Sequence, residues 1–105
     1  MTDIALVRVT CANQAEAERI AEIAVRDRLA ACANIEAPCR SVYRWDDKVE
    51  RASEAPVLFK TRMALAQRLA DTIAELHSYD LPAIEIWPAA VSPALAQWVE
   101  IETGA

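Results

Sequence analysis

The sequence predicts an α+β sandwich in which two helices cover one face of a four-stranded antiparallel sheet. Strand-like and helix-like stretches follow one another in the order β-α-β-β-α-β, and a short final helix comes after them. Two of these strands form one long hairpin around Asp46 and Asp47, whose short carboxylate side chains favour turns. The 105 residues, 54% apolar and 26% charged, suit a single domain over residues 1–105. Two split βαβ units in series make the ferredoxin-like arrangement.

The first strand and the first helix are indicated over residues 4–10 and 14–30. The strand is a short apolar run, and Asn13 is suited to cap the helix, with Glu16 three residues later as in a capping box. An apolar stripe at helical spacing should be buried, whereas Glu16 and the other charged residues of this helix should be exposed. The stripe consists of Ala17, Ile20, Ala21, Ala24, Val25 and Leu29.

The hairpin should be unusually long. A strand begins at Cys32, bends at Ala37-Pro38 and gives arms over about 34–46 and 48–60, longer than a usual strand of about 5–6 residues. Tyr43 and Trp45 fall on one face of it at period two. These rings either pack onto the domain's own body or belong to an arm that pairs with other copies of the chain, and we favour the arm.

The second half of the chain completes the sandwich. Residues 65–77 form an amphipathic helix, 78–82 a loop, and 83–87 a fourth strand that Pro88 makes short or places at an edge. Ser92-Pro93 begins the final helix, which Gly104 ends. Its packed face should comprise Leu95, Trp98 and Val99. The second face of the sheet stays bare, and we expect association there through Tyr43, Trp45 and Trp87.

Charge and composition exclude several partners. A net charge of −5 argues against nucleic acid and against anionic membrane surfaces. No stretch approaches the roughly 20 apolar residues of a membrane span, and the N-terminus has no signal-peptide pattern. Three cysteines, an odd number, favour reduced thiols and a cytoplasmic location.

Several blocks along the chain resemble one family, the CutA divalent-cation tolerance proteins. They run nearly from end to end and are specific in their separation. They are Val9-Thr10, Arg28-Leu-Ala-Ala-Cys-Ala-Asn-Ile35, Arg40-Ser-Val-Tyr-Arg-Trp45, Lys60-Thr-Arg62, Glu75-Leu-His-Ser-Tyr-Asp-Leu-Pro82 and Trp98. The chain departs from the family at two points. His77-Ser-Tyr-Asp80 stands where the family has His-Pro-Tyr-Glu, and Asp46-Asp47 stands where its hairpin turn carries a glycine.

The resemblance implies a homotrimer whose long hairpins wrap across neighbouring subunits, with a structural similarity to the PII signalling proteins. It also implies a link to the tolerance of copper and other divalent metals, metal binding, and no agreed reaction. We therefore expect a binding protein and not an enzyme. A nucleophilic pair of Cys32 and His77 is conceivable, but no third residue supports it.

Two residues are the candidate metal ligands. His77 is the only histidine and stands at a helix end, where it serves either as a cap or as a ligand near Tyr79 and Asp80. Cys32 holds the position of the family's most characteristic cysteine. It is either a small buried apolar residue or a thiolate ligand, for Cu(I) or, together with imidazole, for zinc. The spacing of cysteines and histidine does not support a closed zinc site within one chain, and a site shared between subunits stays open as an alternative.

A second group is a candidate small-molecule cleft. In the family, polar residues near the hairpin and the His-x-Tyr loop line a cleft between subunits, which here points to Trp45, Glu50, Glu54, Lys60 and Tyr79. The simpler interpretation makes Lys60 and Glu54 a structural ion pair. The alternative function is a PII-like signalling or scaffold trimer that binds a small molecule or a protein partner there.

Overall fold

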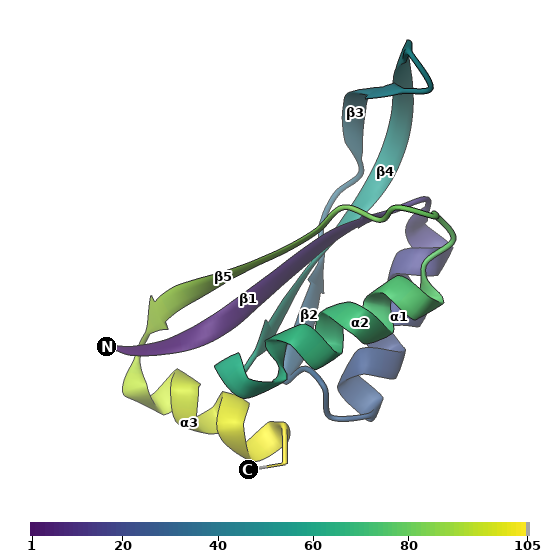
Figure 1. The fold of residues 1–105 in the computed structure, drawn as a ribbon. Helices are drawn as coiled ribbons and strands as arrows, with labels where there is room; N and C mark the ends of the chain where they lie inside the picture. The colour runs from purple at the N-terminus through teal and green to yellow at the C-terminus, as the bar shows by residue number, and fades with distance from the viewer. Residues whose placement is uncertain (105) are drawn as a thin grey trace.

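The computed structural model describes residues 1–104. One antiparallel sheet and three helices make up the fold, as expected (Figure 1). The strands are β1 (Thr2–Cys11), β2 (Cys32–Ile35), β3 (Cys39–Trp45), β4 (Lys48–Thr61) and β5 (Ile84–Val91). The helices are α1 (Gln14–Arg26), α2 (Ala66–Leu76), which follows a 3-10 turn at Met63–Leu65, and α3 (Pro93–Glu102). Among the described residues, no helix is long and apolar enough to cross a membrane.

The strand order β2-β4-β1-β5, with β3 continuing beside the far half of β4, is the order that two split βαβ units produce. Alternation along β1 separates the two faces of the sheet. Val7, Val9 and Cys11 are fully buried and pack with α1 and α2, whereas Arg8 and Thr10 on the opposite face are half-buried. A smaller cluster joins Ile4 to the residues of α3. The second face was predicted to be bare, but α3 packs against its Ile4 end. The rest of that face has no helix on it within residues 1–104 (Figure 1).

The N-terminal turn of α1 differs from the prediction in one important respect. Asn13 caps the helix by accepting a hydrogen bond from the Glu16 amide at 2.9 Å, as expected. Glu16 itself is buried and not exposed, because the segment after α2 packs over this turn. The helix also ends at Arg26 and not at residue 30, because Arg28 adopts a left-handed conformation with φ of 60°. Val25 is exposed at the edge of the apolar stripe.

The hairpin of β3 and β4 projects from the body and accounts for the elongated shape of 45 × 25 × 22 Å (Figure 1). Asp46 and Asp47 form its two-residue turn with φ of 51° and 60°, the left-handed pair that a type I′ turn requires. Residues 36–38 interrupt the first arm, where the bend was expected. Tyr43 and Trp45 stay about half exposed in the single chain.

Two expectations for the second half of the chain are corrected. The fourth strand does not stop before Pro88 but continues to Val91, with Pro88 opposite Ala5. Of the two alternatives predicted for Pro88, a short strand or an edge strand, the second is correct, because β5 lies at the edge of the sheet. Proline is tolerated on an edge strand because the outer side of the strand has no neighbour that requires a backbone N–H. On α3, Val99 is buried but Trp98 is 42% exposed, so Trp98 does not belong to the packed face.

Candidate functional site

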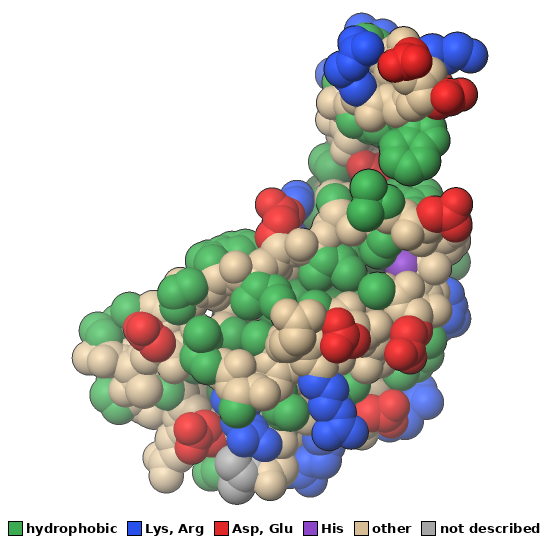
Figure 2. Space-filling view, in the orientation of Figure 1, with side chains coloured by type: hydrophobic (Ala, Val, Ile, Leu, Met, Phe, Trp, Pro, Cys, Tyr) green, Lys and Arg blue, Asp and Glu red, His purple; other side chains and the backbone are tan. Residues whose placement is uncertain are grey.

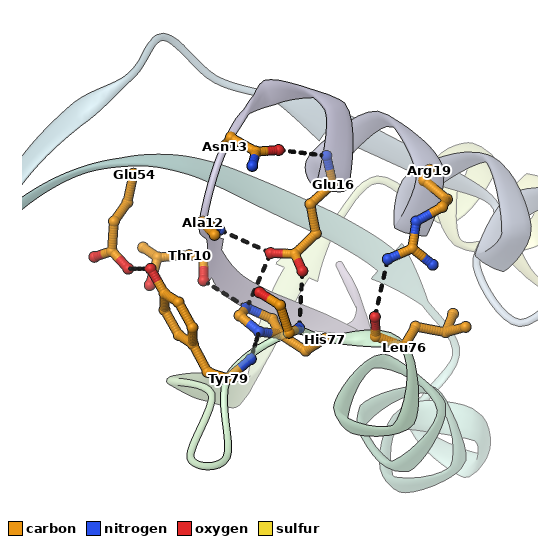
Figure 3. Close-up of polar contacts among 10 residues, drawn as sticks. Thr10, Ala12, Asn13, Glu16, Arg19, Glu54, Leu76, His77 and Tyr79 are labelled. Atoms are coloured by element: carbon orange, nitrogen blue, oxygen red, sulfur yellow. Dashed lines mark hydrogen bonds and ion pairs between the residues drawn. The ribbon is translucent and has the colours of Figure 1, made fainter.

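His77 ties the segment after α2 to the end of β1. Its Nε2 lies 2.9 Å from the Thr10 carbonyl oxygen, and its Nδ1 accepts a hydrogen bond from the Tyr79 amide at 3.0 Å (Figure 3). One accepting and one donating nitrogen is the pattern of a neutral imidazole, with the proton on Nε2. The ring is fully buried. His77 is therefore more than an exposed helix cap.

Glu16 approaches the same ring from α1. Its carboxylate accepts hydrogen bonds from the Ala12 and Ser78 amides, both at 2.8 Å, and one oxygen lies 3.9 Å from His77 Nε2 (Figure 3). Burial by itself raises the pKa of Glu16, but these hydrogen bonds outweigh it and hold the pKa below its usual value of 4.5. Glu16 is therefore an ionised buried carboxylate that fastens two loops together.

Cys11 completes a cluster with these two residues. The candidate ligand atoms of Cys11, Glu16 and His77 all lie within 4.8 Å of one another, and all three residues are buried. Burial, followed by the nearby carboxylates of Glu16 and Glu54, raises the pKa of the Cys11 thiol to about 11. The cluster thus offers sulfur, nitrogen and oxygen donors, with the sulfur protonated at neutral pH.

The structure does not bring the two predicted metal ligands together within one chain. Cys32 is half-buried in β2 opposite Lys60, whereas Cys11 is opposite Ala55 on the same strand. Five residues along β4 correspond to roughly 16 Å. His77 instead meets Cys11 and Glu16, which sequence reasoning did not identify as functional. The alternation along β1 places Cys11 on the same buried face as Val7 and Val9. No feature of the neighbouring sequence indicates that it meets His77, which is 66 residues away.

A cleft of about 570 Å³ separates the hairpin from the body. Figure 2 shows apolar side chains on both sides of the narrow junction between them. The Tyr79 hydroxyl donates a hydrogen bond to Glu54 across it at 3.0 Å. Burial, and then this carboxylate, raise the pKa of Tyr79 to about 12. The lining includes Ser41, Tyr43, Trp45, Glu54, Tyr79 and Asp80.

The other two residues predicted for the cleft lie elsewhere. Lys60 donates a hydrogen bond to Asn34 at 2.8 Å, and it stands six residues, roughly 20 Å, from Glu54 on one strand. The expected ion pair between Lys60 and Glu54 is therefore wrong. Glu50 is exposed on the hairpin opposite Tyr43 and is not part of the lining. Trp87, predicted for association, is 39% exposed on β5.

Comparison with known proteins gives one answer. A family model described as CutA1 divalent ion tolerance protein matches residues 5–102. The divalent-cation tolerance protein CutA of Pyrococcus horikoshii is 38% identical over 79 residues, which cover 75% of this chain and 76% of that protein. Protein CutA of Homo sapiens is 37% identical over 80 residues, 76% of this chain and 45% of that protein. This chain spans about half the length of the first eukaryotic relatives.

The solved structures agree with the sequences. The crystal structure of the divalent ion tolerance protein CutA1 from Ehrlichia chaffeensis superposes with a TM-score of 0.92 at 34% identity. It covers 100% of this chain and 99% of that one, so the projecting hairpin and the C-terminal helix are both included in the match.

Proposed function

The chain belongs to the CutA1 divalent ion tolerance family, and on that basis we propose that it binds a divalent metal ion at the buried cluster of Cys11, Glu16 and His77. The observation that supports the proposal is the approach of three different ligand atoms to within 4.8 Å of one another. Ligand atoms around a tetrahedral zinc ion lie about 3.5 Å apart, given metal bonds of about 2.0–2.3 Å. A contraction of about 1 Å would therefore close the cluster around an ion.

The donor set favours borderline and soft metals. Sulfur and imidazole nitrogen suit zinc and copper, whereas calcium and magnesium prefer shells made of oxygen atoms. Cys11 and His77 would be the principal ligands, with Glu16 supplying the third. Copper, the metal that the family resemblance implied, is therefore a suitable ion for this site. Zinc is the second suitable ion.

Binding at this cluster is coupled to protons. Cys11 must lose a proton that its environment holds up to a pKa of about 11. The proton of His77 must move from Nε2 to Nδ1, which breaks the hydrogen bonds with both the Thr10 carbonyl and the Tyr79 amide. Metal affinity should therefore rise with pH, with about one proton released for each ion bound.

A competitive titration tests the proposal. The purified protein is titrated with Cu(II) and Zn²⁺ against a chelator of known affinity, beside the variants Cys11→Ala and Cys32→Ala. We expect Cys11→Ala to weaken binding at least about tenfold, or 1.4 kcal/mol, and Cys32→Ala to leave it unchanged. Loss of binding in Cys32→Ala alone would contradict this cluster and favour a site shared between subunits.

We further propose that the working unit is a homotrimer in the cytoplasm. Its support is the projecting hairpin, the sheet face without helices, and the exposed rings of Tyr43, Trp45 and Trp87. The free thiols of all three cysteines support the location. Light scattering at micromolar concentration should give three times the chain mass, and Trp87→Ala should weaken assembly. A monomeric parent protein would contradict the trimer.

The cleft favours a second candidate function, a PII-like signalling or scaffold protein that binds a small molecule. Its volume of about 570 Å³ falls within the usual range for ligand sites of about 300–1,000 Å³. The lining is mainly apolar with a few polar groups, as such sites are. A ligand should raise the melting temperature in a concentration-dependent way. A metabolite screen without any shift would count against this function.

A further inference from the structure

We infer that the cleft binds small organic cations of the ammonium class, with Glu54 as the counter-charge and the rings of Tyr43, Trp45 and Tyr79 around the cation. This inference rests on the second candidate function above and names the chemical class of its ligand. The Cys11 side chain packs on the helix-covered face of the sheet, but Tyr79 of the cleft contacts His77 of the Cys11 cluster, so the two sites adjoin.

Aromatic rings supply the first part of the argument. Tyr43 and Trp45 come from β3, and Tyr79 comes from the loop after α2, so rings stand on two separate elements of the cleft. In the single chain their exposed fractions are 41%, 52% and 36%, and all three residues line the cleft. Tyr43 and Trp45 are also proposed for the trimer interface, so in the trimer this cleft would lie beside a neighbouring subunit. A cation within about 6 Å of an aromatic ring centre is attracted by the ring quadrupole, and methylated ammonium groups are recognised in this way.

Charge supplies the second part. Glu54 is only 8% exposed, and one of its oxygens accepts the Tyr79 hydroxyl. Within residues 1–104 it forms no ion pair, although a carboxylate removed from water normally needs a cationic partner. Asp80 adds a second carboxylate to the lining. The cleft therefore carries negative charge beside its aromatic surface.

The remaining charges argue against other ligands. Arg8 is the one cationic side chain of the lining, and its guanidinium already lies 3.4 Å from Glu85, so an anion would compete with that carboxylate. Among the described residues, Glu54 and Asp80 are not part of the group of close metal-ligand atoms, which consists of Cys11, Glu16 and His77. An organic cation uses both the rings and the carboxylates, whereas an anion or a bare metal ion uses only part of the lining.

The test compares two probes of the same shape. Choline carries a quaternary ammonium, and 3,3-dimethyl-1-butanol is its neutral isostere. Calorimetric titration of the full-length assembled protein at low salt should show choline binding at least tenfold tighter than the alcohol. Glu54→Gln should weaken choline binding about tenfold, whereas Glu75→Gln, an exposed position on α2, should not change it. The Trp45 indole N–H resonance should shift with choline in the parent protein.

Two outcomes overturn the inference. Equal binding of the two probes, or no binding of choline, would show that charge is not recognised. Should Glu54→Gln fail to fold, Trp45→Leu replaces it, with light scattering to show that this variant assembles like the parent. Unchanged choline binding in that variant would equally contradict the site. A melting-temperature screen with carboxylate and phosphate metabolites separates failure of the cation inference from failure of the small-molecule function. A shift with these compounds alone would retain the small-molecule function and reject the cation, whereas no shift with any compound would reject both.

Discussion

His77 Nε2 lies 2.9 Å from the carbonyl oxygen of Thr10, so the imidazole joins the end of α2 to the end of β1. The same nitrogen faces Glu16 at 3.9 Å, so it is the one that the proposed metal site would use. The structural role of His77 Nε2 and its role as a proposed metal ligand therefore exclude each other, because binding an ion there breaks the hydrogen bond to the Thr10 carbonyl that holds the loop. Metal binding should consequently change the loop that carries Tyr79, which also lines the cleft.

Replacing His77 should destabilise the protein. His77→Ala leaves the Thr10 carbonyl and the Tyr79 amide without partners and opens a cavity, which should lower the free energy of unfolding by about 2–4 kcal/mol. Urea unfolding of the variant beside Glu75→Ala, an exposed control on α2, measures this difference. A loss no larger than that of the control would show that the imidazole contacts contribute nothing to stability.

Stability should depend on acid through Glu16. Its pKa is lower in the folded protein than its ordinary value of 4.5, so the folded state favours the ionised form. The stabilisation is complete well above pH 4.5 and is lost as the pH falls below that value toward the lower folded pKa.

The free energy of unfolding should be measured from pH 7 to pH 3 for the parent and for Glu16→Gln, with Glu18→Gln as an exposed control on the same helix. We expect the advantage of the parent over Glu16→Gln to shrink as the pH falls, while the parent and Glu18→Gln change in parallel. A constant difference between parent and Glu16→Gln would disprove the depressed pKa.

The hairpin turn offers a stabilising change. Asp46 and Asp47 both have positive φ, and Asn-Gly adopts this pair of conformations more readily than Asp-Asp. The double variant Asp46→Asn/Asp47→Gly should raise the free energy of unfolding by about 0.5–1 kcal/mol, whereas Asp47→Ala should lower it. Thermal unfolding ranks the three proteins, and a less stable Asn-Gly variant would show that the carboxylates stabilise the turn in another way.

The fold could be predicted from the sequence because its signals are local. The Asn13 and Ser92 caps, the stripe of α2 and the turn at Asp46 each lie within a few residues of the element that they define. The errors arose where tertiary contacts decide. From the sequence, Pro88 indicates the end of a strand, and only the sheet topology shows that it lies within an edge strand. Trp98 reads as core until the register of α3 is fixed.

The candidate site was only half predictable for the same reason. His77 and the cleft residues Trp45, Glu54 and Tyr79 were identified from the sequence. Glu16 reads as an exposed residue of the first helical turn, because the loop that buries it comes 62 residues later.

The last prediction concerns Arg28, which combines a strained backbone with a capping side chain. Its φ is 60°, while its guanidinium donates hydrogen bonds to the Ile101 and Glu102 carbonyls at 2.7 and 3.2 Å, at the C-terminal end of α3. A cation is favourable at that end of a helix dipole. Arg28→Ala removes the cap but keeps the strain, whereas Arg28→Gly removes both.

We therefore expect Arg28→Gly to be more stable than Arg28→Ala by about 1 kcal/mol, with both less stable than the parent. Hydrogen exchange of the α3 amides should accelerate equally in the two variants, because both lose the cap. Urea unfolding supplies the stability difference and exchange supplies the local readout. Equal stability of the two variants would show that the left-handed conformation is not strained. Unchanged exchange would show that the guanidinium does not hold the helix end.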